Sequence, residues 1–211
     1  MAKIRPKIHF LCSACGDDFP KWYGQCPSCK EWGSLSEYKI SHKKNGRKLE
    51  TRESRSLASI LAQEPGTRIS TGLKEADRVL GGGLLSGSLL LLGGSPGVGK
   101  STLALHICAG IDRKAFYVSA EESEEQVGLR ARRLNVNSEH LHLSGENELD
   151  GIISHIERIS PDLVIIDSIQ TIMNSGLDSL PGSPSQLRDC GQRFLEVSKQ
   201  KGVIIMIIGH V

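Results

Sequence analysis

Short apolar runs alternate with amphipathic stretches over most of the chain. Five runs have the length of strands, are rich in Val, Ile and Leu, and end at turn residues or polar caps. They are Leu89–Leu92, Ala115–Ser119, Leu141–Ser144, Leu163–Asp167 and Val203–Gly209. Between them the pattern predicts helices over residues 100–111, 123–134, 149–159 and 185–200. Strands that alternate with helices indicate an α/β fold with a mainly parallel sheet covered on both faces.

The first 56 residues lack this pattern. Residues 9–38 hold four of the six cysteines, both tryptophans and several turn-forming residues, which indicates a small module held together through its cysteine side chains. The following segment, KISHKKNGRKLETRESRS, has almost no apolar content and cannot repay the entropy of ordering itself. We therefore predict a four-cysteine module over residues 1–38, a basic linker over 39–56 and an α/β core over 57–211.

Length and composition are those of a globular protein. The 211 residues, of which 38% are apolar, suffice for one ordinary domain and a small appendage. No stretch approaches the ~18 uninterrupted apolar residues of a membrane span. The first thirty residues carry charges and cysteines where a secretory signal needs an apolar run. We expect a cytoplasmic protein with no membrane partner.

Charge is unevenly distributed. Residues 1–56 carry twelve Lys and Arg against six Asp and Glu, whereas the remainder carries fourteen against eighteen. A basic front end on a mildly acidic body favours an anionic partner. A solvated charged face explains the same asymmetry equally well.

The segment GSPGVGKS matches the phosphate-loop pattern and stands between a predicted strand and a predicted helix. Glycines let successive backbone N–H groups face phosphates, Lys100 reaches the β- and γ-phosphates, and Ser101 supplies a hydroxyl to Mg²⁺. A glycine turn with a chance lysine is the alternative, which the strand, loop and helix order disfavours. The residues expected to hold ATP in this segment are Gly94, Ser95, Pro96, Gly97, Val98, Gly99, Lys100, Ser101 and Thr102.

Three further polar residues follow predicted strands and complete the expected site. Asp167 ends an apolar strand, as suits a carboxylate that holds Mg²⁺, although it would also suit the cap of the next element. Glu121 is a candidate for orienting the attacking water, with Glu122 as the adjacent competitor. The acids of the EESEE run also favour a helix start without doing chemistry. His210 would sense the γ-phosphate, or would be a surface histidine.

Two CxxC pairs, Cys12 with Cys15 and Cys26 with Cys29, are separated by ten residues. Four thiolates at this spacing predict a tetrahedral metal site, with zinc favoured over iron. Two disulfides are the alternative, which a reducing cytoplasm disfavours.

Trp22, Tyr23 and Trp32 lie around the cysteine pairs. They would stack on unpaired bases beside Lys21 and Lys30, or they would form the core of so small a module. The second interpretation is the one we favour from sequence. Cys108 and Cys190 lack partners at ligand spacing and are expected to be buried thiols.

Three stretches together resemble the bacterial RadA (Sms) family of DNA repair proteins. They are FLCSACGDDFPKWYGQCPSCKEWGSL, then RISTGLKEADRVLGGGLLSGSLLLLGGSPGVGKSTL, and then FYVSAEESEEQVGLRARRL with LVIIDSIQTI and IIMIIGHV. The resemblance covers nearly the whole chain and corresponds to the amino-terminal portion of that family.

The resemblance implies a RecA-like ATPase core behind a zinc finger, acting on single-stranded and branched DNA in recombinational repair. It also implies a homo-oligomeric ring and a recombinase partner. It places Glu121 as the residue that activates water, Asp167 as the Mg²⁺ carboxylate and His210 as the reader of the γ-phosphate. Residues 173–189 correspond to a first DNA-binding loop, although composition alone indicates only flexibility.

The chain also departs from the family pattern. Family members continue with a second DNA loop, a Lys-Asn-Arg-Phe-Gly motif and a Lon-protease-like domain, so we expect this chain to be a fragment or a truncated product. Ala120 stands where the family has glycine. The leading hypothesis is a DNA-dependent ATPase that performs branch migration. The alternatives are a zinc-containing DNA-binding module with a non-hydrolysing nucleotide domain and, less favoured, a small-molecule kinase.

Overall fold

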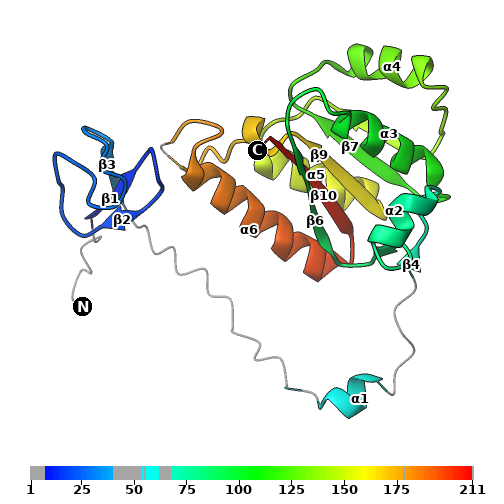
Figure 1. Ribbon diagram of the computed structural model, residues 1–211, viewed down its shortest axis with the longest axis horizontal. Helices are drawn as coiled ribbons and strands as arrows, with labels where there is room; N and C mark the ends of the chain where they lie inside the picture. The colour runs from blue at the N-terminus through cyan, green and yellow to red at the C-terminus, as the bar shows by residue number, and fades with distance from the viewer. Residues whose placement is uncertain (1–7, 40–53, 55, 62–67, 178, 211) are drawn as a thin grey trace. The chain divides into compact units, whose positions relative to one another are not determined.

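The computed structural model describes residues 8–39, 54, 56–61, 68–177 and 179–210. They belong to two compact units that divide between Gly66 and Thr67 (Figure 1). Most of the predicted linker, residues 39–56, lies outside the described part of the chain. A short helix, α1 (Leu57–Leu61), belongs to the first unit.

The first unit contains a three-stranded antiparallel sheet. Its strands are β1 (Ile8–Cys12), β2 (Asp18–Phe19) and β3 (Leu35–Lys39), in the order β2-β1-β3. The buried centre is small and consists of Cys12, Cys26 and Leu35, with Phe10, Cys15 and Phe19 packed against it. So few apolar side chains give little hydrophobic stabilisation, which is why modules of this size need a metal or disulfides.

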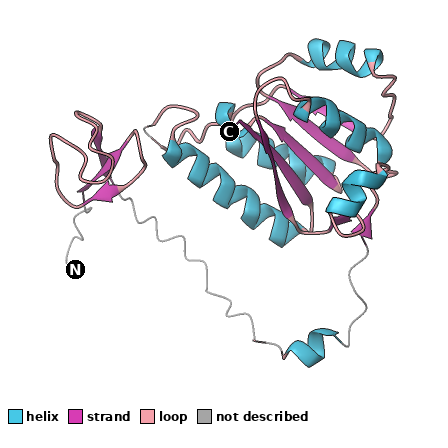
Figure 2. Cartoon of the chain, in the orientation of Figure 1, coloured by secondary structure: helices cyan, strands magenta, loops and turns pink. Residues whose placement is uncertain are grey.

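A five-stranded parallel sheet forms the centre of the second unit (Figures 1 and 2). The strands are β6 (Leu89–Gly94), β7 (Ala115–Ser119), β8 (Leu141–Ser144), β9 (Leu163–Asp167) and β10 (Ile204–His210), in the order β6-β10-β9-β7-β8. The helices are α2 (Lys74–Val79), α3 (Lys100–Gly110), α4 (Glu124–Arg133), α5 (Leu149–Ile159), α6 (Pro184–Lys201) and the 3-10 turn η1 (Ile169–Thr171). Two short strands, β4 (Arg68–Ile69) and β5 (Leu84–Leu85), pair antiparallel beside them.

Helices cover both faces of this sheet. Alternate strand residues, such as Phe116 and Val164, pack against α5 and α6, while their neighbours Tyr117 and Ile165 pack against α3 and α4. Because successive side chains of a strand point to opposite faces, a strand buried on both faces must be apolar throughout. This explains the continuous apolar runs of the sequence, and the α/β fold and parallel sheet are confirmed.

The predicted elements differ from the observed ones chiefly at their ends. β6 continues to Gly94, and β10 runs over Ile204–His210 rather than Val203–Gly209. The predicted helices begin and end within one residue of the observed α3 to α6, because Ser123 caps α4 and the left-handed Ser160 ends α5. The strands of the small unit, and the β4–β5 pair, were not predicted.

In the described part of the chain, β6 is the outermost strand on one side of the sheet. β6 pairs with β10 on one side, and its Leu91 side chain is 74% exposed on the sheet edge. An apolar hollow of about 540 Å³ lies beside it, lined among others by Val79, Leu91 and Met206. None of the described helices is long and apolar enough to cross a membrane.

Candidate functional site

The carboxyl ends of four parallel strands bring the predicted site residues to one edge of the sheet. In the strand registers His210 lies opposite Gly94, and Ser119 lies opposite Asp167. Glu121 follows two residues after the end of β7. Ligands of parallel α/β sheets bind outside the carboxyl ends of the strands, so this edge is the expected position for a nucleotide.

The loop between β6 and α3 curls around the side chain of Lys100. Gly97 and Gly99 have φ angles of 80° and 95°, which residues with a Cβ rarely adopt. Gly99 caps α3, so Lys100, Ser101 and Thr102 occupy the first turn of the helix. The Lys100 ammonium donates to the carbonyls of Gly94, at 2.8 Å, and Ser95, at 3.0 Å, and only 7% of the residue is exposed. The amino end of α3 and a nearly buried cation therefore face the same loop.

Asp167 is a buried carboxylate at the end of β9. The hydroxyl of Tyr117, which is fully buried on β7, donates to Asp167 Oδ2. Burial raises the pKa of Tyr117 well above its usual range, and the negative charge of Asp167 raises it further, so the phenol stays protonated. A buried carboxylate needs such a partner, and the hydroxyl fixes one of its two oxygens.

Glu121 is held between two other elements. The Ser168 hydroxyl, which is buried directly after β9, donates to Glu121 Oε1. His210 Nε2, at the end of β10, lies 3.5 Å from the same oxygen. Ser168 and His210 thus both contact the Glu121 carboxylate. The three residues lie at the carboxyl ends of β9, β10 and β7, on the side of the sheet that carries the loop.

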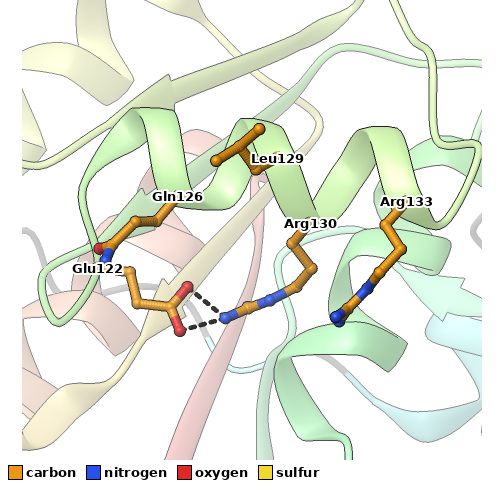
Figure 3. Close-up of a pocket in the computed structure, with 5 residues that line it drawn as sticks. All are labelled: Glu122, Gln126, Leu129, Arg130 and Arg133. Carbon is orange, nitrogen blue, oxygen red and sulfur yellow. Dashed lines mark hydrogen bonds and ion pairs between the residues drawn. The ribbon is translucent and has the colours of Figure 1, made fainter.

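Glu122, the competitor of Glu121, is turned toward α4 instead. Both of its carboxylate oxygens accept from the Arg130 guanidinium, and the two side chains line a hollow of about 360 Å³ (Figure 3). Gln126, Leu129 and Arg133 complete the lining of this hollow. Glu122 is thus engaged by a guanidinium through both oxygens, whereas the contacts of Glu121 with Ser168 and His210 involve only its Oε1.

The four cysteines of the two CxxC pairs form one cluster. Their sulfur atoms all lie within 4.8 Å of one another, with Cys12 and Cys29 at 3.6 Å and Cys15 and Cys26 at 3.7 Å. Sulfurs bound at about 2.3 Å to a tetrahedral zinc ion lie roughly 3.8 Å apart, so the cluster fits zinc in geometry as well as in donor type.

The ionisation of the cluster also calls for a cation. Burial raises the pKa of Cys12, but hydrogen bonds with Ser34 Oγ and nearby backbone N–H groups outweigh this and lower it to about 6. For Cys15, the N–H of Asp17 lowers the pKa, whereas burial and the three neighbouring thiols raise it to about 12. Four thiolates at this separation repel one another, so a divalent ion is needed to keep all of them ionised.

The tryptophans do not form the core of the small unit, contrary to the interpretation we favoured from sequence. Trp22 and Trp32 are 60% and 73% exposed. Sulfur atoms, Phe10, Phe19 and Leu35 fill the centre of the module instead. Tyr23 packs edge-on against Phe19 with ring centroids 5.9 Å apart. Cys108 and Cys190 are fully buried, as predicted.

Within the stretch 173–189, of which the structure describes all but residue 178, hydrogen bonds tie the loop to a helix. Residues 184–189 belong to α6, and Asn174 connects the preceding loop to that helix. The Asn174 N–H donates to Gln186 Oε1 at 2.8 Å, and its side-chain amide donates to Asp189 at 2.7 Å. The prediction that this stretch contacts DNA remains a prediction.

Sequence reasoning missed three residues of the site, namely Tyr117, Ser168 and Arg130. Tyr117 reads as one more apolar strand residue, and Ser168 as a turn residue after a strand. The only available signal was position, because Ser168 follows Asp167 and Tyr117 lies two residues before the end of its strand.

Comparison with known proteins gives one match in each part of the chain. Residues 66–211 match the family model described as AAA domain, and residues 10–37 match a rubredoxin metal binding domain. The chain is 40% identical to DNA repair protein RadA of Bacillus subtilis over 220 residues, which cover 100% of the chain and 48% of the relative. RadA of Rickettsia bellii is 43% identical, covering 98% and 47%. RadA of Haemophilus influenzae is 37% identical, covering 100% and 48%. The resemblance to RadA is confirmed, and the chain spans about half the length of these curated relatives.

Proposed function

Because the chain belongs to the AAA domain family and is similar along its whole length to RadA proteins, we propose that it is a DNA-dependent ATPase of DNA repair. In this proposal it hydrolyses ATP to act on single-stranded or branched DNA during branch migration. The observation that carries the proposal is the meeting of a phosphate loop, the Asp167 carboxylate and the Glu121–Ser168–His210 group at one edge of a parallel sheet.

The phosphates of ATP would replace the bonds that Lys100 makes within its own loop. Its ammonium donates to the carbonyls of Gly94 and Ser95, so it is preorganised beside the loop. A polyphosphate would receive the ammonium, the loop N–H groups and the positive end of α3 together. Gly94, Ser95, Pro96, Gly97, Val98, Gly99 and Thr102 complete this cradle in the proposal.

A bound Mg²⁺ would supply positive charge that offsets the negative charge developing on the phosphate oxygens. Ser101 and Asp167 are the proposed residues that hold it, the carboxylate through water. Tyr117 donates to one oxygen of Asp167, and the other oxygen is the one that would accept from metal-bound water. Phosphoryl transfer consists mostly of positioning and charge neutralisation, so these fixed contacts are where catalysis would arise.

Glu121 is the proposed residue that orients the attacking water. The Ser168 hydroxyl fixes its side chain, and His210 lies near enough to respond when a γ-phosphate arrives. His210 is thereby proposed to report the nucleotide state to the rest of the chain.

Substitution of Lys100 tests the nucleotide site directly. We expect Lys100→Ala to abolish ATP hydrolysis and to leave the metal content of the first unit unchanged, since the two units have separate cores. Phosphate release at the parental rate by folded Lys100→Ala protein would refute the assignment.

A second candidate function is a zinc-containing DNA-binding module attached to a nucleotide domain that binds without hydrolysing. The separate metal centre favours it. Phosphate release measured with and without single-stranded DNA separates the two functions, because only the ATPase is stimulated by DNA.

The remaining parts of the proposal concern partners and setting. We further propose zinc at the four-cysteine cluster, a homo-oligomeric ring, a recombinase partner and a cytoplasmic location; the geometry of the cluster supports the first of these. The measurements are zinc content, sedimentation with and without ATP, and co-purification of a recombinase.

A further inference from the structure

Two exposed tryptophans lie side by side on the metal module and have no role in the ATPase site. We propose that Trp22 and Trp32 form a stacking surface for the unpaired bases of single-stranded DNA. This inference rests on the DNA part of the proposed function but is independent of ATP binding and hydrolysis.

The two indole rings meet over Gly24. A Cβ at that position would lie 3.5 Å from Cζ3 of Trp32 and 3.7 Å from Cη2 of Trp22, so both rings approach one small point of the backbone. Both side chains nevertheless remain more than half exposed. Two exposed indoles thus lie next to the same point of the backbone.

The backbone fixes this arrangement. Gln25 and Trp32 form an antiparallel bridge, the Gly33 N–H donates to the Gly24 carbonyl at 2.9 Å, and the Cys26 N–H donates to the Glu31 carbonyl at 2.9 Å. The two tryptophan-bearing segments are therefore joined by hydrogen bonds next to the metal ligand Cys26. An aromatic surface that is already in place loses little conformational entropy on binding.

The chemistry around the rings favours a nucleic acid. Lys21 precedes Trp22, Lys30 lies two residues before Trp32, both lysines are exposed, and Glu31 is the one acid within residues 19–33. The excess positive charge of residues 1–56 lies in the flanking residues 1–7 and 40–56, because residues 8–39 carry three lysines against four acids, so a polyanion is attracted by the segments on either side of the module. Indoles stack on any unpaired base, whereas a paired duplex presents no free base face. A protein ligand would instead call for a larger apolar patch than two rings provide.

Tryptophan emission offers a direct test, because Trp22 and Trp32 are the only two tryptophans of the whole chain. The zinc-loaded full chain would be titrated with oligodeoxythymidine of about 20 nucleotides, long enough to cover one single-strand site. We expect saturable quenching by the single strand, and little quenching by a duplex of equal length or by heparin, which has negative charge but no bases.

The variants Trp22→Ala and Trp32→Ala should each weaken binding about tenfold, as loss of one base–aromatic stack does. Binding would be followed with end-labelled oligonucleotide by fluorescence anisotropy. The loss should be the same at low and high salt, because stacking is not screened. Trp32→Phe should keep most of the affinity, and Lys21→Gln should lower affinity mainly at low salt.

Zinc content equal to that of the parent serves as the folding control for every variant. Equal quenching by heparin and the single strand would overturn the proposal, as would unchanged affinity of the double Trp22→Ala, Trp32→Ala variant. Loss of binding to a co-purifying protein, with DNA binding intact, would assign the surface to that protein instead. Lys100→Ala should retain the quenching, so failure of the ATPase proposal and failure of this one give different results.

Discussion

At the scale of single residues, two neighbouring glutamates have different surroundings. Glu121 is held by a hydroxyl and lies near His210, whereas Glu122 accepts from the Arg130 guanidinium with both oxygens. Composition and spacing left these two acids as competitors, because adjacent residues share every signal that those patterns provide, and only the resemblance to the RadA family singled out Glu121.

This difference predicts opposite results for matched substitutions. Glu121→Gln should lower kcat for ATP hydrolysis by about 100-fold or more, the usual effect of removing a general base, while nucleotide binding persists. Glu122→Gln should leave kcat within about twofold and lower the free energy of unfolding by at most roughly 1 kcal/mol, because its ion pair is partly solvated. Phosphate release and urea denaturation measure both. A larger loss of kcat in Glu122→Gln would reverse the assignment.

The buried phenol provides a second prediction. Tyr117→Phe removes the hydroxyl that donates to Asp167, so we expect the free energy of unfolding to fall by about 1–2 kcal/mol. The Mg²⁺ concentration needed for half-maximal hydrolysis should rise, because the carboxylate is less well oriented. Tyr23→Phe, at an exposed tyrosine of the small unit, is the control and should change neither quantity. An unchanged Mg²⁺ requirement would mean that the hydroxyl serves stability only.

At the scale of elements, two helical glycines have contrasting surroundings. Gly110 ends α3, and a Cβ there would lie 2.2 Å from the Thr71 carbonyl oxygen. Gly128 lies within α4, and a Cβ there meets nothing within 4 Å. The close approach at Gly110 lets α3 pack against the segment that leads into α2.

These surroundings predict effects of opposite sign. Gly110→Ala should destabilise the large unit by about 2 kcal/mol or more, because backbone atoms must move apart. Gly128→Ala should stabilise it by roughly 0.5–1 kcal/mol through helix propensity. Thermal unfolding followed by circular dichroism measures both, and stabilisation by Gly110→Ala would contradict the observed contact.

The elements predicted from sequence are those whose own residues form a recognisable apolar run or a helical pattern of apolar positions. The strands Ala115–Ser119 and Leu163–Asp167 are buried on both faces, so their apolar runs are unbroken and their ends are sharp. The two-residue strands β4 and β5 are too short for any period to appear. Contacts such as Ser168 with Glu121 depend on which strands are neighbours, and that order is a tertiary property. The exposure of Trp22 and Trp32 was missed because four sulfur atoms fill space that aromatic rings fill in a metal-free module.

At the scale of the whole molecule, the two units have separate cores and separate spectroscopic reporters. Both tryptophans belong to the first unit, and all but one of the described helices belong to the second. Tryptophan emission therefore follows the metal module, while far-ultraviolet circular dichroism follows chiefly the nucleotide unit.

Metal removal should affect one unit only. We expect about one zinc per chain, lost on chelation under reducing conditions and in Cys12→Ser or Cys29→Ser, since each removes one of four ligands. Tryptophan emission should change with the loss, whereas the midpoint of the circular dichroism transition should stay within about 2 °C. A large shift of that midpoint on chelation would mean that the two cores are energetically coupled.

The open edge of β6 has a consequence for how the protein behaves in concentrated solution. In the part of the chain that the structure describes, β6 pairs with β10 alone, and a strand edge with a protruding Leu91 and an adjoining apolar hollow can recruit extended segments from other molecules. We expect light scattering to rise with protein concentration and with time. Leu91→Lys, which sets a charge on that edge, should suppress the rise without altering the melting temperature, and Leu129→Lys on exposed α4 should not. The solubility of this chain would then be governed by a single strand edge, whatever its net charge.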